Sequence, residues 1–143
     1  MKNLVSIFAG HDSTVSFWNA ENDKYYTIEI ERLVKKRYFR LHEDNSPEEQ
    51  EKILEQCRDI AEKEWGIKND YECILIGSDG YVQTNPAAIF NTESVKTIAS
   101  HHQTHAASAY YLSPFDRALI VSYDGGGDDG HFNIYFAHED GIK

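Results

Sequence analysis

The alternation of hydrophobic and polar positions predicts three short strands at the start of the chain. Residues 4–8 form a continuous apolar run, which is typical of a buried strand. Residues 14–18 and 25–30 are rich in β-branched and aromatic side chains, and a turn-forming segment precedes each of them. We therefore expect three antiparallel strands joined by tight turns.

A helix with clear signals at both ends is expected next. Ser46 offers a capping hydroxyl, Pro47 suits the first helical position, and Glu49 completes the pattern of a capping box. Gly66 provides a stop. Apolar residues recur between them at helical spacing: Ile53, Leu54, Cys57, Ile60, Ala61 and Trp65. The pattern predicts one helix between Ser46 and Gly66.

The second half of the chain alternates short apolar segments with turns. A helix is expected over residues 102–111, because Ser113 and Pro114 would end it. The expected strands are residues 73–76, 95–99, 118–123 and 131–137, and the expected turns are residues 77–80, 124–130 and 139–141. The strand that should follow the last turn is missing. We interpret residues 1–143 as the N-terminal portion of one domain, cut at a loop of a longer protein.

Composition narrows the classes of function. The formal net charge of -10 argues against a general nucleic-acid binder, which needs a basic face. Cys57 and Cys73 are too few and too far apart for a disulfide framework. No apolar run approaches the ~18 residues that a membrane span requires. The N-terminus lacks the features of a signal peptide, so we expect a cytoplasmic protein with no membrane partner.

A histidine-rich segment is the first candidate for chemistry. Residues 101–105 read His-His-Gln-Thr-His. Positions four apart lie on one face of a helix, so His101 and His105 can point at one metal ion. Two ligands are too few for a tight site, and a third must come from elsewhere. The alternative is that these are ordinary surface or core histidines.

Two turns could hold an anion or its metal ion. Residues 10–13, Gly-His-Asp-Ser, can present backbone N–H groups and a hydroxyl, with a carboxylate beside them. Residues 124–130 combine glycines, which let the backbone approach a phosphate, with acidic residues that could hold Mg²⁺. The second segment is neither a P-loop nor a Rossmann fingerprint. Plain hairpin turns explain both segments as well.

A basic cluster lies in this otherwise acidic chain. Its members are Arg32, Lys35, Lys36, Arg37 and Arg40. Guanidinium groups bind phosphates and carboxylates in a bidentate manner, so a ligand role is open. The alternative is a solvated end of a surface strand.

Taken in order, these segments resemble the N-terminal part of the O-carbamoyltransferases, which include nodulation-factor and antibiotic-tailoring enzymes. The resemblance involves Gly10-His11-Asp12-Ser13, Glu31-Arg32 with the basic stretch behind it, residues 101–116, and Asp124-Gly125 after a strand. Its most specific part is the histidine segment, residues 101–105, with the Ala-Ala-Ser-Ala run at 106–109 and the Ser-Pro-Phe tail at 113–115. The resemblance spans nearly the whole chain, although the helix between residues 46 and 66 contributes little.

The resemblance implies an α/β fold of the actin-like, ribonuclease H-like kind, related to the threonylcarbamoyl tRNA-modifying enzymes. We expect a half-domain with a mixed sheet that opens in three antiparallel strands and is flanked by helices. The resemblance also implies that His101 and His105 bind a catalytic iron or zinc ion. A further carboxylate ligand would lie beyond Lys143.

The implied reaction joins ATP, used with Mg²⁺, and carbamoyl phosphate into a carbamoyl-adenylate. The carbamoyl group then passes to the hydroxyl of a small-molecule acceptor, and missing C-terminal domains take part. Asp12, and less favourably His11, is the expected base. Ser13, Asp124, Gly125 and Gly126 are expected near the nucleotide phosphates.

Two other interpretations remain open at this point. The chain could be a non-catalytic metal- or nucleotide-binding module, or a scaffold whose histidines have no chemical role. If further domains are missing, an apolar surface should be left uncovered, so we expect a tendency to form homo-oligomers.

Overall fold

The computed structural model describes residues 1–77, 82–98, 100–126 and 129–143. The chain forms two compact units, Met1–Ile98 (unit 1) and Ala99–Lys143 (unit 2), and each is described by itself. Some predicted features lie outside the described residues: residues 78–80 of the expected turn at 77–80, the last residue of the expected strand at 95–99, and Gly127 and Asp128 of the glycine-rich turn.

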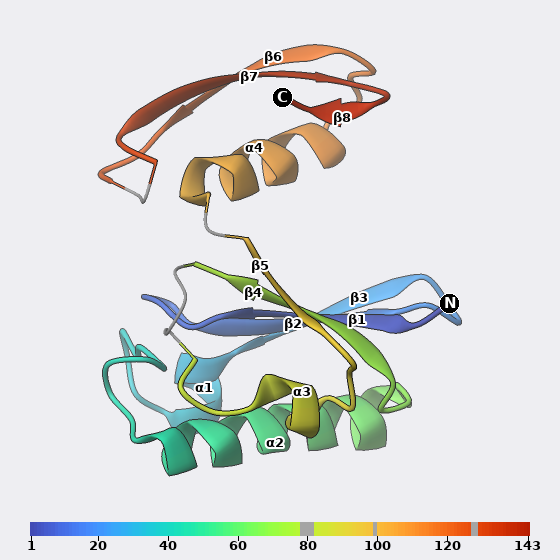
Figure 1. The fold of residues 1–143 in the computed structure, drawn as a ribbon, viewed down its shortest axis with the longest axis vertical. Coiled ribbons are helices and arrows are strands. Elements are labelled where there is room, and N and C mark those ends of the chain that lie inside the picture. The colour runs from blue at the N-terminus through green and yellow to red at the C-terminus, as the bar shows by residue number, and fades with distance from the viewer. Residues whose placement is uncertain (78–81, 99, 127–128) are drawn as a thin grey trace. The chain divides into compact units, whose positions relative to one another are not determined.

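Unit 1 is built on a five-stranded mixed sheet in the order β3-β2-β1-β4-β5 (Figure 1). The strands are β1 (Asn3–Phe8), β2 (Thr14–Asn19), β3 (Lys24–Glu29), β4 (Tyr71–Ile76) and β5 (Val95–Ile98). The first three strands pair antiparallel, as predicted, and β4 pairs parallel with both β1 and β5. The parallel pairing needs a crossover, which the intervening helix provides.

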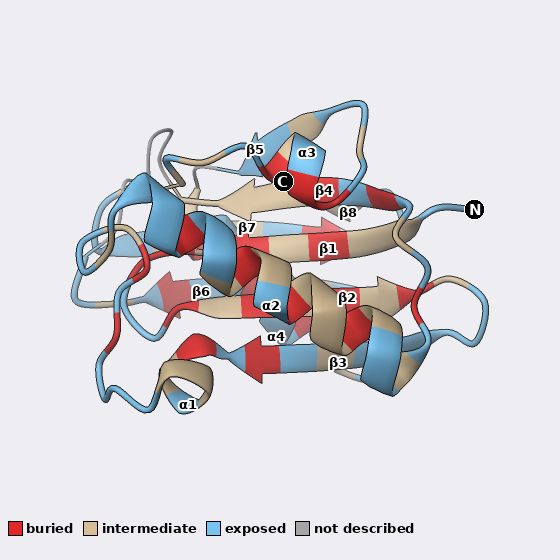
Figure 2. Ribbon diagram, turned by 90° about the horizontal axis from the view of Figure 1, so that it is seen from below, coloured by how far each residue is buried: buried red, intermediate tan, exposed pale blue. Residues whose placement is uncertain are grey.

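The expected helix is present as α2 (Pro47–Trp65), and both of its end signals are confirmed. The Ser46 side chain accepts a hydrogen bond from the Glu49 N–H, and the Glu49 side chain accepts one from the Ser46 N–H. Gly66 has φ 66°, a left-handed conformation that costs glycine little. Its buried residues, Gln50, Leu54, Cys57 and Ala61, recur at intervals of three and four, and they form a stripe along the helix (Figure 2).

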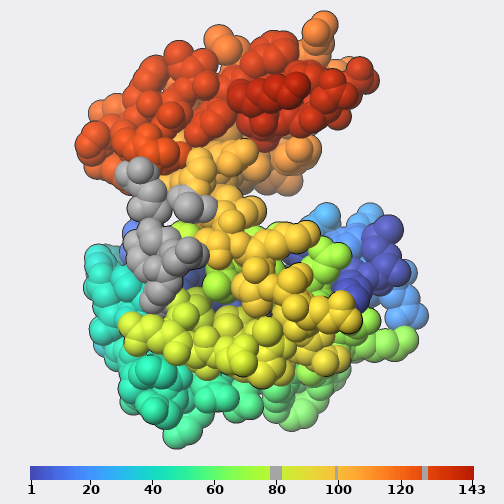
Figure 3. All heavy atoms as spheres, in the orientation of Figure 1, coloured from blue at the N-terminus to red at the C-terminus, as the bar shows by residue number. Residues whose placement is uncertain are grey.

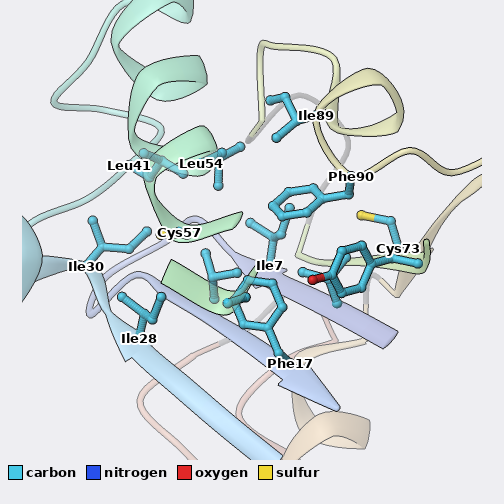
Figure 4. Packing of buried hydrophobic residues seen from close by; sticks show 14 of the residues in the cluster. Ile7, Phe17, Ile28, Ile30, Leu41, Leu54, Cys57, Cys73, Ile89 and Phe90 are labelled. Carbon is cyan, nitrogen blue, oxygen red and sulfur yellow. The ribbon is translucent and has the colours of Figure 1, made fainter. Parts of the chain in front are cut away.

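The core of unit 1 lies between α2 and the sheet (Figure 4). Phe17 of β2 is at its centre and makes edge-to-face ring contacts with Trp65, Tyr71 and Phe90 at centroid distances of 5.8–6.1 Å. Such contacts add to the free energy gained by burying the rings. Cys57 and Cys73 are free and buried, and burial raises the pKa of each thiol to about 12, so both behave as small apolar residues.

Two short helices of unit 1 were not expected from the sequence. Helix α3 (Pro86–Ile89) begins at Asn85, whose side chain accepts from the Ala88 N–H. Helix α1 (Ile30–Val34) follows β3 directly and contains Arg32, so the interpretation of this basic segment as a strand end is wrong. Ile30 is fully buried, and its apolar side chain made the strand look one residue longer than it is.

Unit 2 consists of one helix on a three-stranded antiparallel sheet in the order β6-β7-β8 (Figure 1). Its elements are α4 (His101–Tyr111), β6 (Ala118–Tyr123), β7 (Phe132–His138) and β8 (Gly141–Ile142). The helix and the hairpin are confirmed. The expectation that no strand follows the turn at residues 139–141 is wrong, because β8 pairs with β7 through Ala137–Ile142 and His138–Gly141. Among the described helices, none combines the length and the apolar character that crossing a bilayer requires.

Candidate metal centre and its supporting network

Unit 2 brings three potential metal ligands together at one end of its helix. His101 and His105 lie one turn apart on α4, and Asp124 directly follows the last residue of β6. Nε2 of His101 is 2.8 Å from Oδ2 of Asp124, Nε2 of His105 is 3.2 Å from the same oxygen, and the two nitrogens are 3.0 Å apart. These three residues are called the His/His/Asp triad below. The sequence predicted the two histidines as a pair of metal ligands, whereas the carboxylate ligand was expected beyond Lys143.

Hydrogen bonding alone leaves the His/His/Asp triad incompletely satisfied. An ionised carboxylate only accepts hydrogen bonds, and each imidazole Nε2 carries at most one proton. At most two protons are therefore available for the three contacts between these atoms. If both nitrogens carry a proton, two donors face each other at 3.0 Å; if one does, one contact joins two lone pairs. A cation at the centre would satisfy all three atoms at once.

The distances between the three ligand atoms of the triad suit a divalent first-row transition metal. Bonds of about 2.1 Å that meet at right angles place neighbouring ligand atoms about 3.0 Å apart. The observed separations of 2.8, 3.0 and 3.2 Å surround that value. Two imidazoles and one carboxylate on one face also form the donor set of non-haem iron sites, and zinc accepts the same donors. The residues present therefore fit an iron or zinc ion.

The electrostatics of the site keep Asp124 ionised. The hydrogen bond to His101 is the main cause that holds the pKa of the Asp124 carboxyl well below its usual range, and the Gly125 N–H, 2.5 Å from Oδ1, lowers it further. The carboxylate remains partly exposed to solvent, with 42% of its side-chain surface accessible. A negative, solvent-accessible oxygen is the form of aspartate that binds a metal ion.

A second set of residues fastens the N-terminus of α4 to the turn after β6. Ser100 is the N-cap residue, and its hydroxyl accepts from the Gln103 N–H. The same hydroxyl donates to Oδ2 of Asp129 at 2.6 Å, and the His102 N–H donates to both Asp129 oxygens at 3.1 and 3.2 Å. Partial burial by itself would raise the pKa of the Asp129 carboxyl. These hydrogen bonds stabilise the ionised form more strongly, so the net pKa is below its ordinary value. Asp129 thus places a negative charge at the positive end of the helix.

His102 differs from its two histidine neighbours because its side chain is completely buried. Its Nε2 is 2.9 Å from the Gly130 carbonyl oxygen, and its Nδ1 is 2.7 Å from the Ser122 hydroxyl. A carbonyl can only accept, so Nε2 carries the proton and Nδ1 of the neutral ring accepts from Ser122. His102 therefore joins α4 to β6 and to the start of β7, and Ser122 lies two residues before Asp124. This ring is a positioning group for the triad.

Over the part that the structure describes, the carboxylates of the glycine-rich turn bond mostly to α4 and its N-cap residue, Asp124 to His101 and Asp129 to Ser100 and His102. The Gly125 N–H donates to Asp124, and Gly126, at φ 154°, lies against the His131 ring. Asp124 faces the histidines rather than the centre of the turn. The expected roles of Asp124, Gly125 and Gly126 toward a nucleotide phosphate stay predictions, and the geometry of Asp124 adds a competing role as a metal ligand.

The other predicted turn, residues 10–13, belongs to unit 1. Ser13 is fully buried, its hydroxyl donates to the Gly10 carbonyl at 2.5 Å, and it accepts from the Leu41 N–H at 2.9 Å. Asp12 has a left-handed backbone, φ 55°, and its carboxylate is 3.0 Å from Nδ1 of the exposed His11. The turn is thus confirmed, and Ser13 links it to the loop that contains Leu41. Catalytic roles for Asp12 and His11 stay predictions.

Most of the basic cluster is neutralised locally. Arg32 pairs with Glu29, Lys36 with Asp44 at 3.0 Å, and Arg40 with Glu43 at 2.8 Å. The guanidinium of Arg37 lies 4.6 Å from the ring centre of Tyr38. Exposed ion pairs of this kind contribute little to stability because water and salt screen them. No assigned role follows from the geometry of Arg32, Lys35, Lys36, Arg37 or Arg40.

Sequence reasoning missed the contributions of His102, Ser122 and Asp129. His102 was visible only as one of three neighbouring histidines, and nothing local distinguishes the buried ring from the two that face Asp124. For Asp124, the signal was its position at the carboxyl end of an apolar strand. That signal predicted a polar site but not which partners it would meet.

Comparisons with known proteins give limited matches. No protein-family model matches the chain. A segment is similar to the uncharacterised protein sll1178 of Synechocystis sp. PCC 6803, with 38% identity over 56 residues. The match covers 29% of this chain and only 9% of that relative.

Among solved structures, the chain is similar to YeaZ from Pseudomonas aeruginosa, with a TM-score of 0.52 and 12% sequence identity. The similarity covers the whole of this chain and 63% of YeaZ, so the chain spans somewhat less than two thirds of that neighbour. At this level of identity the likeness concerns the fold. The chain has an α/β fold similar to that of YeaZ, with the mixed sheet and flanking helices expected from the sequence.

Proposed function

We propose that this chain supplies the metal-binding part of an enzyme that transfers a carbamoyl group. The donor is carbamoyl phosphate, the intermediate is a carbamoyl-adenylate made with ATP, and the acceptor is the hydroxyl of a small molecule. The observation that carries the proposal is the convergence of His101, His105 and Asp124 within 3.2 Å of one another. The sequence resemblance supplies the reaction class, and the actin-like fold is compatible with the use of ATP and Mg²⁺.

The roles of the residues follow from their chemistry. His101 and His105 offer imidazole nitrogens, and Asp124 offers a carboxylate oxygen to the same point. An iron or zinc ion held there would act as a Lewis acid toward a phosphoryl or carbamoyl oxygen. His102 and Asp129 keep the ligands in register, because they tie α4 to the strand that ends at Asp124. Asp12 remains the proposed base and Ser13 a proposed contact to the nucleotide.

The proposal treats the chain as one part of a divided active site. Further protein domains would complete the nucleotide and acceptor sites, so the isolated chain should bind metal without turnover. The competing proposal is a metal- or nucleotide-binding module that has no catalytic partner. The same triad supports it, and activity measurements separate the two.

Metal binding by the chain is the first test. Calorimetric titration with Fe²⁺ under anaerobic conditions, or with Zn²⁺, should detect one site per chain. Asp124→Asn and His105→Ala should each weaken binding at least 100-fold, since loss of supporting partners alone costs about 10–100-fold. His131→Ala is the matched control, because it removes an exposed histidine of the same unit that lies outside the triad. Unchanged affinity in Asp124→Asn would refute the assignment of the triad.

The reaction class needs a separate measurement. Carbamoyl phosphate should drive exchange of labelled pyrophosphate into ATP when the chain is part of the complete enzyme, and Asp124→Asn should abolish transfer to an acceptor. The 143 residues alone should show neither activity. Transfer by the chain alone would refute the divided site, and a complete protein that binds metal but shows no carbamoyl-dependent exchange would favour the binding module.

A further inference from the structure

The sheet of unit 2 has one face that no described element of that unit covers. Helix α4 packs on the other face (Figure 1). Side chains alternate between the faces of a strand, and the burial pattern of β6 and β7 follows that rule. Ser122 and Ala137, which belong to the helix side, are buried. The residues at alternate positions are exposed, and together they define the open face of the hairpin. Figure 3 shows the atoms of unit 2 in orange and red.

The open face is largely apolar, and the guanidinium of Arg117 lies 6.0 Å from the ring centre of Phe136 at one end of it. It consists of three residue pairs that lie directly opposite each other on β6 and β7: Leu119–Phe136, Val121–Ile134 and Tyr123–Phe132. Their exposed fractions range from 45% for Phe136 to 81% for Tyr123. The continuous apolar sequence of β6 is typical of a strand that is buried on both faces, whereas unit 2 buries only one.

The size of this face decides what it can do. With about 200 Å² for a fully exposed large side chain, the six residues offer roughly 700 Å² of accessible surface. The largest apolar patch on a typical monomer is about 300–600 Å². A stable interface of standard size buries about 800 Å² on each partner, so this face nearly supplies one.

We propose that the open face is an interface between two copies of this chain. A twofold axis through the Val121–Ile134 pair brings two identical apolar faces together, as in the packing of two sheets about 10 Å apart. None of the six side chains carries a charge, and the one cation beside them, Arg117 over the Phe136 ring, lies at the end of the face farthest from Tyr123 and Phe132. The net charge of -10 on each copy opposes association over longer distances, and salt screens that repulsion.

Sedimentation velocity of the full chain over about 1–100 µM tests the proposal. We expect a species of twice the 16.4 kDa chain mass that becomes more abundant as salt is raised. Val121→Lys combined with Ile134→Lys should weaken association by at least 100-fold, given the apolar area lost. Val121→Thr with Ile134→Thr, which retains β-branched residues in the strands, should weaken it less while leaving the fold intact. Leu112→Lys, 85% exposed but outside the face, is the matched control and should leave the dimer unchanged.

Three outcomes would overturn the proposal. A chain that stays monomeric at all concentrations would mean that another part of the polypeptide covers the face or that solvent does. Association that survives both double variants would place the interface elsewhere. Growth beyond the dimer would indicate open-ended aggregation rather than a closed twofold contact.

Discussion

Replacing His102 by leucine tests whether the buried ring holds the candidate metal centre together. Leucine is close to histidine in volume, so little cavity forms, but the Gly130 carbonyl and the Ser122 hydroxyl both lose their partner. Ser122 is buried, so its unsatisfied hydroxyl costs roughly 1–3 kcal/mol, whereas Gly130 is exposed and water can bond to its carbonyl. We therefore expect His102→Leu to destabilise unit 2 by about 1–3 kcal/mol.

The two units permit a measurement with an internal reference. Both tryptophans, Trp18 and Trp65, belong to unit 1, so tryptophan fluorescence during denaturant unfolding follows that unit alone. Hydrogen exchange read by mass spectrometry on α4 follows unit 2. The protection of α4 should fall roughly 5- to 150-fold in His102→Leu, which is the equilibrium factor that corresponds to this free energy. The fluorescence transition should not move.

Metal affinity distinguishes positioning of the ligands by His102 from a purely structural role, because a purely structural role would leave the affinity of the folded unit unchanged. We expect His102→Leu to weaken Zn²⁺ binding about 10–100-fold even under conditions where the unit is fully folded. Gln103→Leu is the control, because it changes an exposed neighbour on the same helix. If protection of α4 and metal affinity in His102→Leu match those of Gln103→Leu, the positioning role of His102 is refuted.

Two further predictions concern the core and the helix cap. Leu54→Ala should destabilise unit 1 by about 2–5 kcal/mol, because Leu54 is fully buried. Unfolding in guanidinium chloride, followed by tryptophan fluorescence, measures the change, and Glu51→Ala is the exposed control. A loss of stability below about 1 kcal/mol would contradict the packing of Leu54. The folded-state pKa of Asp129 is lowered, so its contribution to the α4 cap is fully present above the ordinary pKa of about 3.9 and is lost as the pH falls through the lower folded value. Protection of the first turn of α4 should therefore fall in strong acid more in the native chain than in Asp129→Asn, and identical pH profiles would show that Asp129 does not cap the helix.

Features that depend on neighbouring residues could be predicted from the sequence. The capping box at Ser46 and the left-handed Gly66 depend on interactions within one turn of α2, so the residue types alone located both ends. The spacing of four between His101 and His105 placed them on one face of α4 for the same reason. The three antiparallel strands followed from apolar segments separated by short turns.

The sequence did not reveal α1 or β8. Ile30 continues the apolar pattern of β3, so the pattern gives no sign of where the strand ends and the helix begins. Strand β8 is two residues long and is defined by pairing with Ala137 and His138 rather than by any pattern of its own. Both elements are too short to leave a periodic signal in the sequence.

The sequence by itself determined that this protein has an α/β fold and a histidine pair able to hold a metal ion. Only the tertiary structure decided which carboxylate completes the group and which histidine is structural. Asp124 is 19 residues from His105, and the two meet because β6 packs against α4 in one particular register. His102 is buried because that packing covers its side of the helix and leaves His101 and His105 at the end of the strand. Contacts of this kind depend on which faces of separate elements meet, and local sequence spacing does not encode that choice.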